Sequence, residues 1–272
     1  MTYPTEVKAI KLRSDRIVIV LMTEIKVYTF NKNSDLLHSA ETYPNPYGLC
    51  HSSNPIVAYP GKQIGQVVLV NIGTQSRTTH SAQSSPPPRH IDAHKNSLAA
   101  IIMNSSGSLL ATASVTGTLI RIFDTGNCQL KHELRRGMNP AHITSICFNN
   151  SNQYICVMSD HGTAHVFDLH SASRSNTSGI ASNQQFVTLH IFLYLFSRTT
   201  NKIFSSHISK IKCHLDTKFK CVCAFSECSP NTLIILAANG SYYKYTFTPN
   251  GSVTRETSCS FLHLVDDCEE LI

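Results

Sequence analysis

Two stretches of the chain are close copies of each other: Ser114-Val115-Thr116-Gly117-Thr118-Leu119-Ile120-Arg121-Ile122-Phe123-Asp124 and Ser159-Asp160-His161-Gly162-Thr163-Ala164-His165-Val166-Phe167-Asp168. Each copy combines the end of one strand, a tight turn with glycine, and a second strand that ends in Phe-Asp. A third copy runs over residues 239–247 and a fainter one over residues 23–30. Because helical periodicity is nearly absent between the copies, the repeat predicts an all-β fold.

The spacing of the copies predicts the architecture. Gly117 and Gly162 lie 45 residues apart, within the range of about 40 to 45 residues for one blade of a WD-repeat propeller. Gly240 follows 78 residues after Gly162, one such period plus an insertion of roughly 33 to 38 residues. We therefore expect a single β-propeller domain over 1–272, with blades at about 5–42, 47–90, 97–135, 141–214 and 218–263, and a long loop at 171–207. A lone blade cannot bury both of its faces, so the blades must stack.

Composition limits the classes of function. Of the 272 residues, 42% are hydrophobic and 15% are charged, which is enough for a buried core and excludes wholesale disorder. The net charge of +6 suits an anionic partner but is low for a nucleic-acid binder, so no nucleic acid is predicted. The N-terminus lacks the pattern of a signal peptide, which favours a cytoplasmic protein.

The ten cysteines do not follow a metal or disulfide pattern. No C-x-x-C occurs, Cys221 and Cys223 alternate along an apolar run, and the others are scattered. We predict reduced thiols that pack in the core, with no metal and no cofactor. One alternative stays open, a structural zinc with ligands drawn from Cys213, Cys221, Cys223 and Cys228 and from His207 or His214.

Enzymatic motifs are missing from the sequence. It contains no G-x-S-x-G elbow, no P-loop, no G-x-G-x-x-G and no H-E-x-x-H. The run Ser159-Asp160-His161 places three successive residues on one turn, where the side chains point in different directions and cannot form a relay. We therefore predict that the chain is not an enzyme.

A pair of arginines lies between the two main copies of the repeat, in Leu134-Arg135-Arg136-Gly137. In an extended segment, neighbouring side chains point to opposite faces, so the two guanidinium groups are expected to serve two separate pockets. Guanidinium groups suit phosphate oxygens because their donors lie in one plane and their charge is permanent. The alternative is a solvated basic turn at the end of a strand.

The flanking copies supply further donors for phosphate oxygens. Around Arg135 the candidates are Thr112, Ser114, Gly117, Thr118 and Arg121. Around Arg136 they are Ser159, Thr163 and His165. Each hydroxyl taken singly is equally explained as a turn residue that bonds its own backbone. The same arrangement on both sides of one arginine pair favours two phosphate sites.

With the double arginine between these repeats, the chain resembles the PROPPIN family, seven-bladed β-propellers that bind polyphosphoinositides. The resemblance covers almost the whole chain and is weakest from about 171 to 215. It implies an adaptor in autophagosome formation that binds phosphatidylinositol 3-phosphate and the 3,5-bisphosphate, recruited to preautophagosomal, endosomal or lysosomal membranes. It adds His94 to the first site and Gly137 to the second, and a serine is usual in the family where Thr112 stands.

The loop at 171–207 falls where PROPPIN members carry a loop that enters the bilayer. It starts polar and then contains an apolar run over 186–196. Eleven residues are too few to span a bilayer, which takes about 20 in a helix, but they can dip into the headgroup region. The expected inserting residues are Phe186, Ile191, Phe192, Leu193, Tyr194, Leu195 and Phe196. The alternative is that this run packs against the propeller.

The resemblance also implies that the chain begins inside the third blade of the family fold, so that two blades are missing and the ring is open. Family members bind the autophagy-2 lipid-transfer protein through their early blades, which weakens the expectation of that partner. Two alternatives to lipid binding stay open at this point. One is a WD-repeat scaffold for protein interactions with vestigial lipid sites, and the other is a non-functional truncated isoform.

Overall fold

The computed structural model describes residues 3, 5–73, 86–170, 207–208, 211–215, 219–249 and 251–260. Over these ranges the regular structure consists of strands, without an α-helix, in five sheets. Neighbouring strands are antiparallel except for one short parallel strand at the edge of the third sheet. The predicted all-β propeller class is thereby confirmed.

Strand bounds are as follows. The first sheet contains β1 (Val7–Leu12), β2 (Arg16–Leu21), β3 (Glu24–Thr29) and β4 (Leu36–Glu41). The second contains β5 (His51–Ser53), β6 (Ile56–Pro60), β7 (Gln66–Asn71) and β8 (Arg89–Asp92). The third contains β9 (Leu98–Met103), β10 (Leu109–Ser114), β11 (Leu119–Asp124), β12 (Leu130–Arg135) and, beside β12, β16 (His207–Ile208). The fourth contains β13 (Ile143–Phe148), β14 (Tyr154–Ser159), β15 (Thr163–Asp168) and β17 (Ile211–His214). The fifth contains β18 (Cys221–Phe225), β19 (Thr232–Ala237), β20 (Ser241–Phe247) and β21 (Val253–Ser260).

The glycines of the repeat occupy the same turn in three sheets, between the second and third strands. Gly117, Gly162 and Gly240 have φ angles of +64°, +66° and +84°. This left-handed backbone is strained for residues with a Cβ atom and open to glycine. Strand-forming residues on either side, such as the Arg-Ile-Val-Ile-Val-Leu run of β2, complete each hairpin.

Apolar side chains from neighbouring sheets meet face to face, and we call each such contact a seam. The seam between the second and third sheets contains Leu69 and Leu110. The seam between the third and fourth sheets contains Leu134 and Val157, and the seam between the fourth and fifth contains Cys156 and Leu233. The core is therefore distributed among the seams, as expected when single blades cannot bury both faces.

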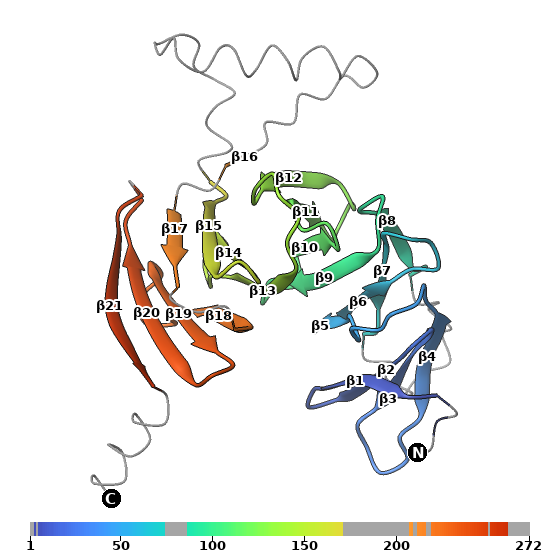
Figure 1. Ribbon diagram of the computed structural model, residues 1–272. Coiled ribbons are helices and arrows are strands. Elements are labelled where there is room, and N and C mark those ends of the chain that lie inside the picture. The colour runs from blue at the N-terminus through green and yellow to red at the C-terminus, as the bar shows by residue number, and fades with distance from the viewer. Residues whose placement is uncertain are drawn as a thin grey trace, which may run out of the picture.

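Figure 1 shows the five sheets following one another along an arc, with the first sheet (blue) and the fifth (red) at its two ends. The third sheet lies midway along the arc, and both of its faces are covered by neighbouring sheets. Residues at the end of β12 therefore border two seams, one on each side of the sheet.

In the described ranges, no helix has the length and apolarity needed to cross a membrane. The run predicted to insert into the bilayer, residues 186–196, lies outside the residues that the structure describes.

Candidate functional site

The arginine pair lies at the end of β12. Leu134 is fully buried in the seam between the third and fourth sheets, opposite Ile120 of β11. The backbone N–H of Arg136 donates to the carbonyl of Thr118 at 2.9 Å, which continues the pairing beyond the last strand residue. Because side chains alternate along a strand, Arg136 follows Leu134 toward that seam, and Arg135 belongs to the opposite face.

The candidates for the first phosphate site share the face of Arg135. In the strand register, Thr112 pairs with Arg121, and Arg121 pairs with Glu133. Paired residues project to the same side of a sheet, and Arg135 follows Glu133 by two positions. Thr112, Arg121 and Arg135 are thus brought to one face, toward the seam between the second and third sheets.

His94 joins this row from the loop before β9. Its Nε2 lies 3.0 Å from Thr112 Oγ1. Burial lowers the pKa of His94 to about 4, and the charge of Arg121 acts in the same direction. The imidazole is therefore neutral at physiological pH, and a nearby phosphate would favour its protonated form.

Glu133 is a member of this cluster that the sequence analysis did not select. Arg121 Nε donates to Glu133 Oε2 at 2.8 Å, and Arg121 Nη1 donates to the carbonyl of Ala93 at 2.6 Å. The carboxylate partly neutralises the arginine that an anion would use. The sequence offered one indication of this role: Glu133 lies two residues before Arg135 in an extended segment, so the two side chains share a face.

Three further first-site candidates lie at the turn between β10 and β11. Ser114, the last residue of β10, is buried, and its carbonyl accepts the Gly117 N–H at 2.9 Å. Thr118 contributes its carbonyl to Arg136. The contacts of this turn are therefore made largely by its backbone.

Arg136 is buried, with 7% of its surface exposed. Its Nε donates to the carbonyl of Gly117 at 2.9 Å, and its Nη2 donates to the carbonyl of Asn139. Burial lowers the pKa of Arg136, while the Asp160 carboxylate acts in the opposite direction. The guanidinium remains charged, because an arginine pKa starts far above neutrality.

The remaining second-site candidates share one face of the fourth sheet. His165 pairs with Val157, Ser159 follows Val157 by two positions, and Thr163 precedes His165 by two. Since Val157 lies in the seam between the third and fourth sheets, these side chains belong to the same seam as Arg136. The Ser159 hydroxyl is buried and has no hydrogen-bond partner among the described residues. His165 is buried, and its ring stacks on Phe167 with centroids 6.4 Å apart.

Gly137 differs from the other glycines of this region. A Cβ atom built on it meets no atom within 4 Å, so the space beside its backbone is open. Gly137 therefore lies beside open space next to Arg136 in the sequence, and not in a packed turn.

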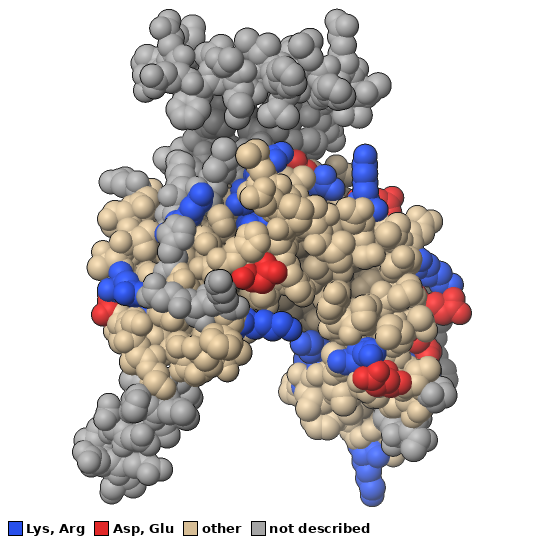
Figure 2. Space-filling model, in the orientation of Figure 1, with Lys and Arg blue, Asp and Glu red and all other residues tan. Residues whose placement is uncertain are grey.

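Positive side chains are spread over the face shown in Figure 2, with acidic side chains between them. Long-range attraction to an anionic surface is therefore modest, in line with a net charge of +6. Selectivity for one anion would require local donors such as those around the arginine pair.

Over the residues that the structure describes, the cysteines of the zinc alternative do not gather into one group. Among the described side chains, the three cysteines that meet are Cys147, Cys156 and Cys223, and only Cys223 belongs to the predicted set. Cys213 and Cys221 lie on β17 and β18 outside this group, and Cys228 is exposed. The true neighbours are far apart in the sequence, and they meet because strands of two sheets face each other.

Comparison with known proteins agrees with the propeller fold. Residues 1–253 match the family model PROPPIN. SVP1-like protein 2 of Pichia angusta is 33% identical over 246 residues, covering 88% of this chain and 65% of that protein. Autophagy-related protein 18e of Arabidopsis thaliana is 32% identical over 251 residues, covering 91% of this chain and 61% of that protein. The chain thus spans less than two thirds of the length of either relative.

Among solved structures, Kluyveromyces lactis Hsv2 superimposes with a TM-score of 0.74 at 20% identity, covering 96% of this chain and 75% of that one. This similarity concerns the fold, because the sequence identity is low. The family match extends over most of the chain and includes the whole region of the double arginine. The chain therefore belongs to the PROPPIN family of phosphoinositide-binding β-propellers.

Proposed function

We propose that the chain is a non-catalytic adaptor in autophagosome formation that moves from the cytosol to membranes and binds phosphatidylinositol 3-phosphate and the 3,5-bisphosphate at two sites. One observation carries the proposal: the adjacent arginines belong to opposite faces of the third sheet, and each seam also contains hydroxyl and imidazole groups. Such clusters of donors around a guanidinium suit the several oxygens of a phosphate.

At the first site, Arg135 is the arginine available to a headgroup. Its side chain is half-buried and makes no hydrogen bond or ion pair with another described residue. Arg121 lies in the same row but is engaged by Glu133. Thr112 and His94 form a hydrogen-bonded pair beside it and offer additional polar atoms.

At the second site, Arg136 is held in place by two carbonyls, from Gly117 and Asn139. A guanidinium has five N–H donors, so a headgroup can bind those that remain without releasing these contacts. The buried Ser159 hydroxyl needs a partner, and a phosphate oxygen meets that need. The open space beside Gly137 allows a ligand to approach the backbone.

The position of β16 supports the proposal that both sites and the insertion face the same membrane. In this strand His207 pairs with Leu134 and Ile208 pairs with Arg135, so β16 lies directly beside the part of β12 that leads to the arginines. Figure 1 shows β16 next to β12. An insertion that ends there is tethered next to the headgroup sites. We propose that residues 186–196 insert into the headgroup region while the arginines bind phosphates.

Flotation of the full chain with vesicles tests this proposal. Vesicles with phosphatidylinositol 3-phosphate are compared with vesicles of equal charge made with phosphatidylserine. Loss of one phosphate-binding arginine is expected to cost about 1.5 to 3 kcal/mol, roughly a 10- to 100-fold weaker affinity. Arg135→Thr with Arg136→Thr should therefore abolish selective flotation.

Lys62→Thr is the matched control. It removes one positive charge where the double variant removes two, and Lys62 is exposed and pairs with Glu41 rather than with a residue of either proposed site. Selective flotation should survive this change. Circular dichroism melts check that the double variant is folded, since Arg136 is buried. A folded double variant that floats as well as the parent chain would refute the proposal.

A further inference from the structure

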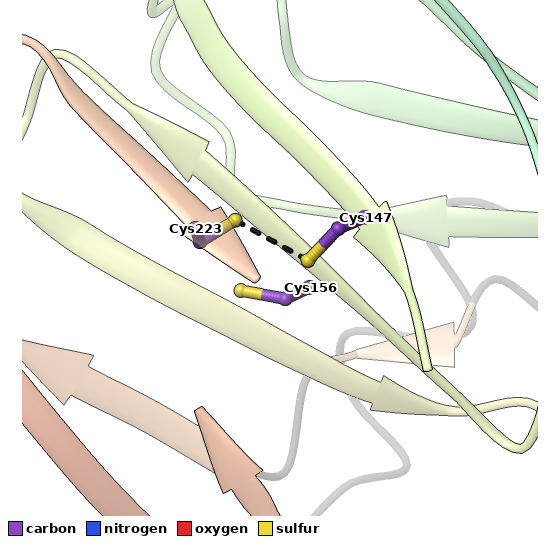
Figure 3. A group of neighbouring side chains, drawn as sticks. All are labelled: Cys147, Cys156 and Cys223. Atoms are coloured by element: carbon purple, nitrogen blue, oxygen red, sulfur yellow. Dashed lines mark hydrogen bonds between the residues drawn. The ribbon is translucent and has the colours of Figure 1, made fainter. Parts of the chain in front are cut away.

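Three cysteine side chains converge between the fourth and fifth sheets, as Figure 3 shows. Cys147 lies on β13, Cys156 is its register partner on β14, and Cys223 comes from β18 of the facing sheet. The three Sγ atoms lie within 4.8 Å of one another, and those of Cys147 and Cys223 are 3.5 Å apart. Thiols from two sheets thus meet at one point.

The surroundings of this cluster are apolar and largely closed to water. Cys156 is fully buried and Cys223 is 9% exposed, while Cys147 is partly accessible at one side. Tyr154 and Leu233 belong to the same core cluster. An ion bound here would be enclosed by protein and would retain a route of entry past Cys147.

One oxygen atom lies beside the sulfur of Cys223. Ser145 precedes Cys147 by two positions on β13, and its Oγ accepts the backbone N–H of Cys223 at 3.2 Å. The same Oγ lies 3.5 Å from Cys223 Sγ. A fourth donor atom is therefore present at the edge of the cluster.

Hydrogen bonds within the cluster favour deprotonation of one thiol. Bonds from Cys147 and Cys156, and one involving Ser145, lower the pKa of Cys223 well below its ordinary value. Burial raises the pKa of Cys156, and so do its hydrogen bonds with Cys147 and Cys223 and the negative charge of those two side chains. Cysteine binds metal ions as the thiolate, so binding of a cation by these side chains would release protons.

We propose that Cys147, Cys156 and Cys223 bind a soft, thiophilic metal cation that joins the fourth and fifth sheets. A Zn–S distance of about 2.3 Å in a tetrahedron implies sulfur atoms about 3.8 Å apart. The sulfurs already span separations around that value, so small side-chain rotations complete the site. Zn²⁺ would take Ser145 Oγ or a water as its fourth ligand, whereas Cu⁺ is satisfied by the three thiolates.

The third cysteine distinguishes a metal site from a redox pair. A disulfide between Cys147 and Cys223 would use only two of the three sulfurs and would leave Cys156 without a role. A cation uses all three, and its positive charge offsets the cost of burying thiolates. This inference does not depend on phosphoinositide binding.

The test uses the reduced full chain under anaerobic conditions. Zn²⁺ and Cu⁺ are added in separate arms, excess ion is removed by gel filtration, and bound metal is measured by elemental analysis. We expect one ion per chain in at least one arm, together with a higher midpoint of thermal unfolding. Co²⁺ added to the parent chain should give the absorption of thiolate-to-cobalt charge transfer.

Cys147→Ala and Cys156→Ala should abolish stoichiometric binding. Cys213→Ala and Cys221→Ala are the matched controls, because both residues are buried in the same core cluster but lie outside the three-sulfur group. Binding of neither ion, equal binding by all variants, or a Cys147–Cys223 disulfide in place of bound metal would overturn the proposal. If the alanine variants do not fold, the parent chain decides alone: absence of the cobalt charge-transfer band together with absence of bound Cu⁺ refutes the site.

Discussion

Replacing Gly117 by alanine should separate the third and fourth sheets at the place where Arg136 is held. Gly117 has a φ of +64°, and a Cβ atom there would lie 1.9 Å from the carbonyl oxygen of Ala141. Ala141 is in the segment that leads into β13 of the fourth sheet. The neighbour is backbone, so it cannot rotate aside as a flexible side chain would.

The expected cost has two parts. Placing a residue with a Cβ atom in the left-handed region destabilises the fold by about 1 to 2 kcal/mol. The displacement of Ala141 adds about 1 to 3 kcal/mol, the usual range for overpacking. Gly117→Ala should therefore lower the free energy of unfolding by about 2 to 5 kcal/mol. It should also weaken vesicle binding, because the carbonyl of Gly117 accepts a hydrogen bond from Arg136.

Gly240→Ala is the matched control for the first part. Gly240 occupies the same turn of the fifth sheet with a φ of +84°, and its Cβ would meet nothing within 4 Å. The free energy of unfolding of this variant should fall only by the cost of the left-handed backbone, about 1 to 2 kcal/mol. The variant should still float with phosphatidylinositol 3-phosphate vesicles.

Urea unfolding followed by circular dichroism measures both variants, since the chain contains no tryptophan to serve as a fluorescent probe. The difference between the two variants isolates the contact with Ala141. Equal losses of stability, with flotation retained in Gly117→Ala, would refute the close contact between the two sheets and its link to Arg136.

Three further predictions concern the neighbourhood of the arginines. Glu133→Gln removes the carboxylate that engages Arg121, so affinity for phosphatidylinositol 3-phosphate vesicles should rise roughly 2- to 5-fold, the scale of a partly exposed ion pair; unchanged or weaker flotation would contradict the role of Arg121. Gly137→Leu should leave the melting midpoint unchanged, because the adjacent space is open, and should weaken flotation about 10-fold if a headgroup uses that space. For His94 the folded pKa of about 4 is below the ordinary 6.5, so the unfolded state binds the proton first. The contribution of neutral His94 to the free energy of unfolding is therefore fully present above about pH 6.5. That free energy falls by up to about 3 kcal/mol as the pH drops to about 4. His94→Gln should flatten that part of the profile in urea titrations, and an unaltered profile would contradict it.

The fold was largely predictable from the sequence, because its main signals are local. The glycines of the repeat mark a turn that needs a left-handed backbone, and Gly117, Gly162 and Gly240 all adopt it. Alternating apolar residues around them specify the strands. No contact between distant residues is needed for either inference.

The candidate sites were less predictable, because they depend on partners from other strands. The order of the sequence placed Arg135 and Arg136 on opposite faces, but it did not reveal that Glu133 engages Arg121. Likewise, Cys221 and Cys223 alternate along an apolar strand, and this pattern gave no indication that Cys223 contacts Cys147 and Cys156. Such meetings require the register of one sheet and its packing on the next.

The parallel pairing of β16 with β12 has a consequence for the order of folding. His207 pairs with Leu134, 73 positions earlier in the chain. During synthesis, the four antiparallel strands of the third sheet emerge long before their fifth, so the edge of β12 stays open until the strands β13 to β15 and the insertion have followed. A contact between residues this far apart forms slowly. The entropic cost of closing the intervening loop nevertheless depends little on its length, since doubling the length adds only about 0.6 kcal/mol. The surroundings of Arg135 are therefore completed late in folding, and insertions of different length can be accommodated there at small energetic cost.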